Sequence, residues 1–260
     1  MKFTALKHAR LISLAGILMM AASSFAANTA IVPAPRDEKD GRFGGKEFIR
    51  RHQEFMEIAR PGKYDVVFLG DSITDMWREE ERAGVPRGKK VWDKYFVPLR
   101  AANFGIGGDR TQHVLWRIQQ GELDPIKPKV VVLLIGSNNT GVEQGTTKPR
   151  NLTPEVIAGI NAVVKELRTR FPQTKILLLG LFPRSEKYDS PQRKQIREIN
   201  TAIAPLHDGK FVHFMDIGDK LLLPNGDIDR KLMPDGTHTN DKGYEIWAKA
   251  IEPKLKALLR

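Results

Sequence analysis

The chain has 260 residues, no cysteine and a formal net charge of +11 at pH 7. The lack of cysteine excludes disulfide bonds and thiolate metal sites. A basic chain can bind polyanions, but its Lys and Arg residues are interleaved with Asp and Glu, as in "RKQIREIN" at 193–200. We therefore interpret most of this charge as a solvated surface and expect no nucleic-acid partner.

Residues 1–26 have the pattern of a secretory signal peptide. Lys2, Lys7 and Arg10 precede an apolar stretch that ends in small residues, and cleavage is expected after Ala26. An uncleaved membrane anchor is the alternative, although the stretch is short for a span of about 20 residues. We expect a secreted or periplasmic protein with no membrane span after cleavage and, since three cations are lost, a net charge of +8.

Residues 27–45 are rich in proline, glycine and charge, which predicts an extended leader or linker. The remaining residues, 46–260, are enough for a single α/β domain. The first predicted helix covers 46–59 and places Phe48 and Phe55 on roughly one side.

Strands and helices then alternate along the chain. The predicted strands are 64–70, 101–105, 130–136, 175–181 and 211–217. The predicted helices are 153–171, 191–206 and a C-terminal helix with Trp247, Ile251, Leu255 and Leu258 on one side. The third strand, "VVVLLIG", is almost wholly apolar, as expected of a central parallel strand covered on both faces. This alternation predicts a three-layer α/β/α sandwich around a mostly parallel, five-stranded sheet.

Unusual segments follow three of these strands. They are "GDS", which ends at Ser72, "NFGIGGD" at 103–109, and "IGSNN", which contains Asn138. A fourth segment, "DGTH", carries Asp235 and His238 before the last helix. Loops at the carboxyl ends of parallel strands converge on one crevice. A serine hydrolase needs a hydroxyl, an imidazole, a carboxylate and hydrogen-bond donors for an oxyanion, and these segments contain all four.

Each segment alone also has an ordinary interpretation. Ser72 could be a helix N-cap, and Asp235 with His238 could form a turn or half of a metal site. The glycine-rich segment could bind phosphate, but neither the G-x-G-x-x-G spacing nor a following Lys-Ser/Thr is present. His113 lies one helical turn beyond that segment, where support of the loop is favoured over catalysis. We expect no cofactor and no metal.

Taken together and in this order, "GDS", "NFGIGGD", "GSNN" and "DGTH" resemble the four sequence blocks of the SGNH (GDSL-type) hydrolases. The segment 105–139 is similar to the catalytic subunits of type I platelet-activating-factor acetylhydrolase and their bacterial relatives. The resemblance covers residues 64–260 and implies the flavodoxin-like fold of that family.

The resemblance also implies a role for each matching residue. Ser72 matches the nucleophile, and Asp235 and His238 match the acid and base of the triad. The oxyanion donors are matched by the N–H groups of Ser72 and Gly108 and by the side chain of Asn138. Among the glycines of the loop, Gly108 matches because the donor glycine of the family directly precedes the Asp of "GGD".

The implied activity is hydrolysis of short-chain acyl esters, acetyl esters above all, through an acyl-enzyme. With export, an acetyl group on a carbohydrate is the favoured substrate, and a phospholipid or lysophospholipid ester is the alternative. A non-catalytic protein that binds cell-wall polymers is the alternative from another class.

Overall fold

The computed structural model describes residues 28–39, 43–143 and 145–260, so the predicted signal peptide lies outside the described residues. At the centre is a five-stranded sheet in the order β4-β1-β5-β6-β7, in which all neighbouring strands are parallel. The strands are β1 (Val66–Gly70), β4 (Ala101–Gly105), β5 (Val130–Leu134), β6 (Lys175–Leu179) and β7 (Val212–Met215). The predicted α/β fold with a five-stranded sheet is therefore confirmed.

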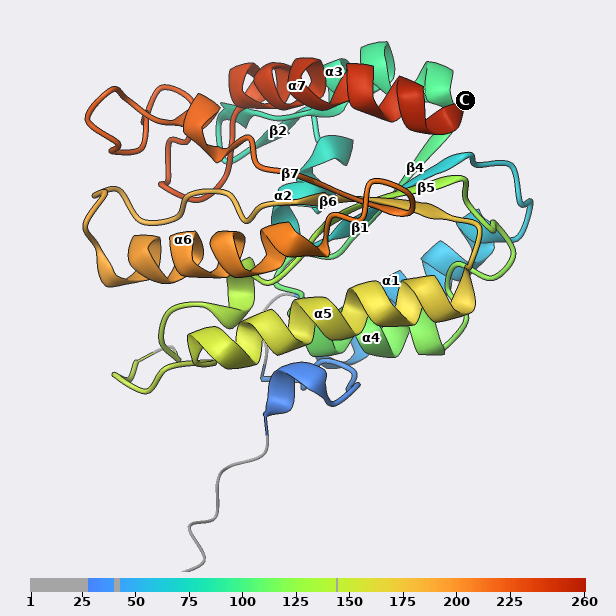
Figure 1. The fold of residues 1–260 in the computed structure, drawn as a ribbon, viewed down its shortest axis with the longest axis horizontal. Helices are drawn as coiled ribbons and strands as arrows, with labels where there is room; N and C mark the ends of the chain where they lie inside the picture. Colours follow the sequence, from blue (N-terminus) through green and yellow to red (C-terminus); the bar gives the residue numbers. More distant parts are fainter. Residues whose placement is uncertain (1–27, 40–42, 144) are drawn as a thin grey trace, which may run out of the picture.

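Helices cover both faces of this sheet (Figure 1). One face carries α3 (Lys89–Tyr95) and α7 (Asp241–Leu259). The opposite face carries α1 (Gly45–Ala59), α4 (Thr111–Gln119), α5 (Thr153–Arg170) and α6 (Pro191–Ile203). A separate antiparallel hairpin is formed by β2 (Glu81–Arg82) and β3 (Val85–Pro86). These layers form the predicted α/β/α sandwich.

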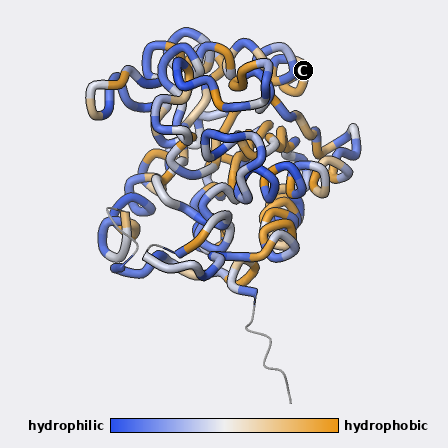
Figure 2. The backbone as a smooth tube through the Cα atoms, turned by 90° about the vertical axis from the view of Figure 1, so that its left-hand side faces the viewer, coloured by the Kyte–Doolittle hydropathy of each residue, from blue (hydrophilic) through white to orange (hydrophobic). Residues whose placement is uncertain are grey.

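The core lies on both sides of the two central strands. Every residue of β1 and β5 is buried, which explains their nearly unbroken apolar sequence. Between the sheet and the α3/α7 layer, Phe68 of β1 packs against Trp92, with ring centroids 4.9 Å apart. Figure 2, which looks onto the carboxyl ends of the strands, shows hydrophilic residues on the outer loops and hydrophobic residues between them.

Several elements differ from the sequence-based expectation. Helices α3 and α4 and the β2/β3 hairpin were not predicted. The predicted helix 191–206 ends at Ile203 and continues as a 3₁₀ turn, Ala204–Leu206. Pro205 explains this end, because proline lacks the N–H that would continue the α-helical pattern.

Residues 28–39, predicted to be an extended leader or linker, pack against the domain. The 3₁₀ turn η1 (Thr29–Ile31) lies beside α4 and α5 (Figure 1). Thr111 Oγ1 donates a hydrogen bond to the Ala30 carbonyl at 2.8 Å, and the Ala34 N–H donates to the Gln112 carbonyl at 3.2 Å. This segment is therefore part of the folded unit.

The strand order fixes where a site can form. Numbered along the chain, the five strands have the order 2-1-3-4-5, whose direction reverses between β1 and β5. Ligands of such sheets bind at this reversal, outside the carboxyl ends of the strands. The loops after β5, β6 and β7 gather at that edge, on the left of Figure 1. Within the described residues, no helix is long and apolar enough to cross a membrane.

Candidate active site

Ser72 lies directly beyond the carboxyl end of β1, as the first residue of the short helix α2 (Ser72–Asp75). Asp71 is the N-cap of this helix, because its Oδ1 accepts the Ile73 N–H at 3.0 Å. The capping function that the sequence left open for Ser72 thus belongs to its neighbour. Gly70 is required here, because a Cβ would collide with the Thr74 hydroxyl and the Leu134 carbonyl oxygen. The Ser72 hydroxyl takes no part in the cap and faces His238 instead.

The predicted triad residues come together at this point. Ser72 Oγ lies 2.8 Å from His238 Nε2. On the other side of the ring, His238 Nδ1 lies 2.7 Å from Asp235 Oδ2. An ionised carboxylate can only accept hydrogen bonds, so Nδ1 carries the proton and Nε2 presents its lone pair to the Ser72 hydroxyl. This is the tautomer that a general base for Ser72 requires.

Asp235 is strongly stabilised as the carboxylate. Its partial burial alone would raise the pKa, but hydrogen bonds from the His238 ring, the His238 N–H and the Thr237 N–H outweigh that effect. These contacts hold the pKa of Asp235 well below its usual range. The side chain is 49% exposed and that of His238 is 21% exposed, so the site is an open one.

The glycine-rich segment and the segment after β5 form the other side of the site. Gly108 has φ +86°, a conformation that side-chain-bearing residues rarely adopt. Within the described part of the chain, the N–H groups of Ser72 and Gly108 have no assigned acceptor. The Asn138 side chain reaches the same loop, since its Nδ2 donates to the Asp109 carbonyl at 3.0 Å.

Asn138 Nδ2 also lies 3.4 Å from Asp71 Oδ2. At this length the contact is weak, and a stronger acceptor placed beside Asn138 Nδ2 can replace it. Burial raises the pKa of the Asp71 carboxyl to about 6, although the Ile73 N–H and electrostatic interactions with His238 and Arg184 oppose the rise. Asp71 therefore serves as a buried link between the serine turn and Asn138.

The structure adds residues that the sequence analysis missed. Arg184, beyond β6, donates from Nη1 to the Ser137 carbonyl at 3.1 Å and to Asn138 Oδ1 at 3.3 Å. Arg150 Nη1 donates to the Asn138 carbonyl at 3.3 Å. Arg184 thus fixes the orientation of the Asn138 side-chain amide, and Arg150 fixes its main-chain carbonyl. The position of Arg184 at a carboxyl strand end was the one available signal for it.

Two buried contacts position the reactive segments from behind. The Tyr244 hydroxyl donates to the Ile73 carbonyl at 2.7 Å and anchors the serine turn to α7. Arg87 Nη1 donates to the Thr239 carbonyl at 2.7 Å, next to His238. Neither contact was predicted, because each joins residues more than 150 positions apart.

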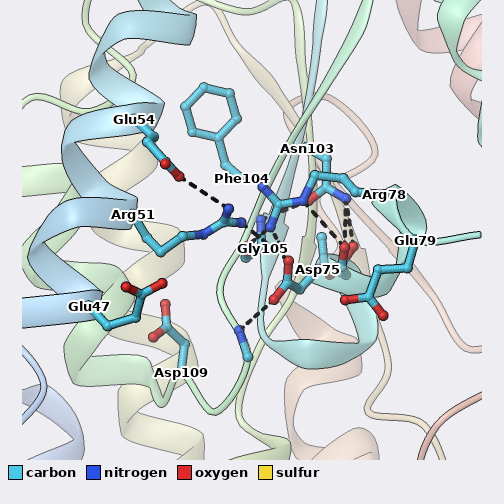
Figure 3. A network of polar contacts seen from close by, with 12 residues as sticks. Glu47, Arg51, Glu54, Asp75, Arg78, Glu79, Asn103, Phe104, Gly105 and Asp109 are labelled. Atoms are coloured by element: carbon cyan, nitrogen blue, oxygen red, sulfur yellow. Dashed lines mark hydrogen bonds and ion pairs between the residues drawn. The ribbon is translucent and has the colours of Figure 1, made fainter. Parts of the chain in front are cut away.

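A network of charged side chains supports the glycine-rich segment (Figure 3). Asp75 lies between Arg51 and Arg78 and pairs with both. Its Oδ2 accepts the Gly107 N–H at 3.0 Å. Asn103 Nδ2 donates to the Thr74 carbonyl at 2.7 Å, which ties β4 to α2. The loop is thereby fixed relative to the serine turn.

His113 supports the same loop from the other side. Its Nδ1 accepts the Arg110 N–H at 3.0 Å. Burial, followed by the nearby positive charges, keeps the pKa of His113 far below its usual range, so the ring is neutral. The ring contacts Phe48 rather than the Ser72 hydroxyl. This is the supporting position favoured by the sequence analysis.

The chemistry available is that of an activated hydroxyl. Ser72, His238 and Asp235 form one hydrogen-bonded row, and within the described residues the nearby N–H groups of Ser72 and Gly108 have no acceptor. Among the described residues there is no cluster of three or more His, Asp or Glu side chains arranged to hold a metal ion. The residues present fit acyl transfer through the serine oxygen.

Comparison with known proteins identifies the family of the chain. Residues 68–246 match the model of the GDSL-like lipase/acylhydrolase family. The chain is 34% identical over 233 residues to platelet-activating factor acetylhydrolase IB subunit alpha1 of Homo sapiens, covering 89% of this chain and 91% of that protein. Subunit alpha2 of Rattus norvegicus is also 34% identical, covering 89% and 92%.

Solved structures show the same fold at lower identity. A GDSL-like lipase from Bacteroides thetaiotaomicron superposes with a TM-score of 0.64 and 18% identity, covering 81% of this chain and 97% of that one. A catalytic mutant of an acetylxylan esterase from Geobacillus stearothermophilus gives a TM-score of 0.55 and 21% identity, covering 74% and 93%. The family model matches residues 68–246, and the acetylhydrolase subunit alpha1 is 34% identical over 89% of the chain. The chain therefore belongs to the GDSL-like lipase/acylhydrolase (SGNH) family and is an ester hydrolase of that family.

Proposed function

We propose that this protein is an exported serine esterase that removes short acyl groups, acetyl in particular, from carbohydrate esters. The observation that carries the catalytic part is the row from Ser72 Oγ to His238 Nε2, 2.8 Å, and from His238 Nδ1 to Asp235 Oδ2, 2.7 Å. In this proposal Ser72 is the nucleophile, His238 is the general base and acid, and Asp235 orients the imidazole.

Acylation begins when Ser72 Oγ attacks the ester carbonyl and His238 Nε2 accepts the hydroxyl proton. The imidazolium is stabilised by Asp235, which stays ionised. The carbonyl oxygen becomes an oxyanion that accepts hydrogen bonds from the Ser72 N–H, the Gly108 N–H and Asn138 Nδ2. When the C–O bond breaks, His238 returns the proton to the leaving alcohol. Water then repeats these steps on the acyl-enzyme and releases the acid.

Asn138 must change partner during this step. Its Nδ2 gives up the 3.4 Å contact to Asp71 for the oxyanion while it keeps the 3.0 Å bond to the Asp109 carbonyl. Arg184 and Arg150 hold the other atoms of the residue, so the amide does not have to rotate. A donor fixed before the charge appears is the arrangement that favours the transition state over the ground state.

Two observations favour an acetyl ester. The relatives at 34% identity carry the name acetylhydrolase, and acetylxylan esterase is among the proteins of similar fold. The open setting of Asp235 and His238 suits an ester that projects from a larger molecule. Export, proposed from residues 1–26, would bring the enzyme to polysaccharides outside the cytoplasm.

The identity to the acetylhydrolase subunits also favours a second substrate, an acetylated phospholipid. The two candidates share the acyl group and differ in the alcohol that carries it. An acyl-chain-length profile therefore tests the first part of the proposal, and the choice of alcohol tests the second.

The experiment uses p-nitrophenyl esters from acetate to laurate, with wild type and Ser72→Ala side by side. We expect kcat/KM to be highest for acetate and to fall with chain length, and Ser72→Ala to be inactive. Acetate release is then measured from acetylated xylan and from platelet-activating factor. Faster release from xylan supports the carbohydrate ester as the substrate. Faster release from platelet-activating factor contradicts it and supports the acetylated phospholipid instead. A preference for laurate would contradict the short-acyl proposal.

Export is tested separately, in the organism that makes the protein. N-terminal sequencing of the mature protein from the extracytoplasmic fraction is expected to begin at Ala27. A chain that keeps Met1 and stays in the cytoplasm would contradict the export proposal.

A further inference from the structure

The peptide unit between Gly107 and Gly108 is held on its carbonyl side by Arg36. Arg36 Nη1 donates a hydrogen bond to the Gly107 carbonyl oxygen. The guanidinium lies directly against Gly108, because a Cβ at that position would be 2.7 Å from both terminal nitrogens of Arg36. Arg36 belongs to the leader and is nevertheless only 7% exposed. The Arg36 side chain is thus buried against the proposed oxyanion loop, whereas an arginine in an extended linker would be solvated.

The geometry of the peptide bond gives this contact a consequence. In a trans peptide the C=O and the N–H are coplanar and point in opposite directions. Fixing the Gly107 carbonyl therefore fixes the direction of the Gly108 N–H. At φ +86° the backbone of Gly108 lacks the steric restriction that a side chain would provide, so a contact from outside the loop is needed to define it.

The neighbouring peptide unit is fixed as well. The Gly107 N–H donates to Asp75 Oδ2 at 3.0 Å, and Asp75 is the last residue of the helix that begins at Ser72. Arg36 and Asp75 thus hold Gly107 through its carbonyl and its N–H. The turn that presents the Gly108 N–H is therefore held to helix α2 through Asp75 and to the leader through Arg36.

Arg36 also changes the strength of the donor. A hydrogen bond from a charged guanidinium to a carbonyl is stronger than a neutral one. It polarises the peptide, which makes the N–H at the other end a better donor, and the effect is larger where water is excluded. A positive charge behind the Gly108 N–H further favours negative charge in front of it.

The leader is built to deliver this side chain. The Ala34 N–H donates to the Gln112 carbonyl at 3.2 Å, and the Gly45 N–H donates to the Arg36 and Asp37 carbonyls at 3.3 and 3.1 Å. These bonds fix the backbone on both sides of Arg36. The leader therefore does more than cover α4 and α5.

We propose that Arg36 is a positioning residue of the esterase, which acts through the Gly107–Gly108 peptide to aim and strengthen the oxyanion donor. This role rests on the proposed function, in which the Gly108 N–H binds the oxyanion. The leader would then contribute to catalysis in addition to the triad and the oxyanion donors.

The test uses the mature chain and compares Arg36→Met, which keeps the length and removes the donors, with Arg36→Lys, which keeps the charge. For p-nitrophenyl acetate we expect Arg36→Met to lower kcat about ten- to hundredfold, less than the loss of a whole oxyanion donor. KM should change less than twofold, because the oxyanion is absent in the ground state. Arg36→Lys should recover part of kcat.

A matched control separates aiming of the donor from loosening of the leader. Asn28→Ala removes the 3.4 Å bond from Asn28 Nδ2 to the Glu155 carbonyl and the 3.0 Å bond from the Ala30 N–H, at the end of the leader away from Gly108. We expect it to lower Tm without changing kcat. A boronic acid inhibitor supplies a second measurement, because its tetrahedral adduct on Ser72 carries the negative charge. Its Ki should rise in Arg36→Met by about the factor by which kcat/KM falls.

The outcomes are distinct. If the wild type is active and Arg36→Met has unchanged kcat and boronate Ki, the role of Arg36 is overturned and the proposed function stands. The same conclusion follows if Asn28→Ala lowers kcat as much as Arg36→Met does. If Arg36→Met does not fold, Arg36→Lys is judged against Asn28→Ala by the same criteria. A wild type inert on every ester overturns the proposed function, and the role of Arg36 with it.

Discussion

Asp235 binds His238 at two points. Its Oδ2 contacts the imidazole Nδ1 at 2.7 Å, and its Oδ1 accepts the main-chain N–H of the same residue at 2.7 Å. One carboxylate therefore fixes both the backbone and the ring of the base. Because the two residues are three positions apart, this unit depends little on the rest of the fold.

Asp235→Asn should disable the base while leaving its position nearly intact. An amide at this position can donate to Nδ1, which moves the ring proton to Nε2 and removes the acceptor for the Ser72 hydroxyl. We expect kcat for p-nitrophenyl acetate to fall about 10⁴-fold at neutral pH. Asp241→Asn is the control, since no bond joins Asp241 to His238 in the described structure, and it should retain activity. Equal losses in the two variants would contradict the assignment.

Substitutions at Asn138 distinguish binding of the transition state from binding of the substrate. Asn138→Ala removes one oxyanion donor and is expected to lower kcat about 10²–10³-fold with little change in KM. Ser72→Ala should leave no measurable turnover. Asn138→Asp should be slower than Asn138→Ala, because it places an acceptor beside the developing charge and near Asp71 Oδ2. Steady-state kinetics on p-nitrophenyl acetate decide this, and an Asn138→Ala enzyme with unchanged kcat would exclude the donor role.

The raised pKa of Asp71 predicts that the free energy of unfolding depends on pH. Burial raises its pKa from 3.8 to about 6, so between these values the folded protein holds a proton that the unfolded chain has lost. The stabilisation from this group is complete below about pH 4 and is lost as the pH rises through about 6, by roughly 3 kcal/mol in all. Urea unfolding of wild type and Asp71→Asn between pH 4 and 7 measures it. The free energy of unfolding should fall less steeply with pH in the variant, and parallel curves would refute the shift.

Tyr244→Phe should destabilise the protein through the serine turn. It removes the 2.7 Å hydrogen bond to the Ile73 carbonyl, which is buried and loses its side-chain partner. We expect the free energy of unfolding to fall by about 1–3 kcal/mol. Tyr95→Phe is the matched control, since its hydroxyl binds the partly exposed Glu245 at 2.8 Å and should cost less than about 1 kcal/mol. Chemical denaturation compares the two, and equal losses would show that the buried bond has no special weight.

The sequence predicted the sheet and the segments of the site because both depend on local patterns. Ser72 and Asn138 stand at the ends of apolar strands, and parallel strands bring such ends together. Helix α4 was missed because it has only nine residues, which is little more than two turns of an amphipathic pattern. Helix α3 has only seven residues and offers few repeats.

The supporting residues could not be predicted in the same way. Arg36 lies 71 positions from the carbonyl it binds, in a segment that has no regular pattern. Whether Asp71 or Ser72 caps α2 depends on side-chain orientation, which adjacent polar residues do not reveal. Arg184 stands at a strand end like the motif residues, but a single arginine there does not distinguish a salt bridge from a contact to Asn138.

The hydrogen bond between Ser72 and His238 spans 166 positions of the chain. The base is carried by the stretch that follows the edge strand β7 and leads into α7, so it meets its partner only after that terminal portion has docked. Long-range closures of this kind slow folding, because the entropy of closing the loop is lost before the contact is gained. Ester cleavage therefore reports the completion of the tertiary structure, and a polypeptide truncated before this stretch would lack both the base and the helix α7 and have no turnover.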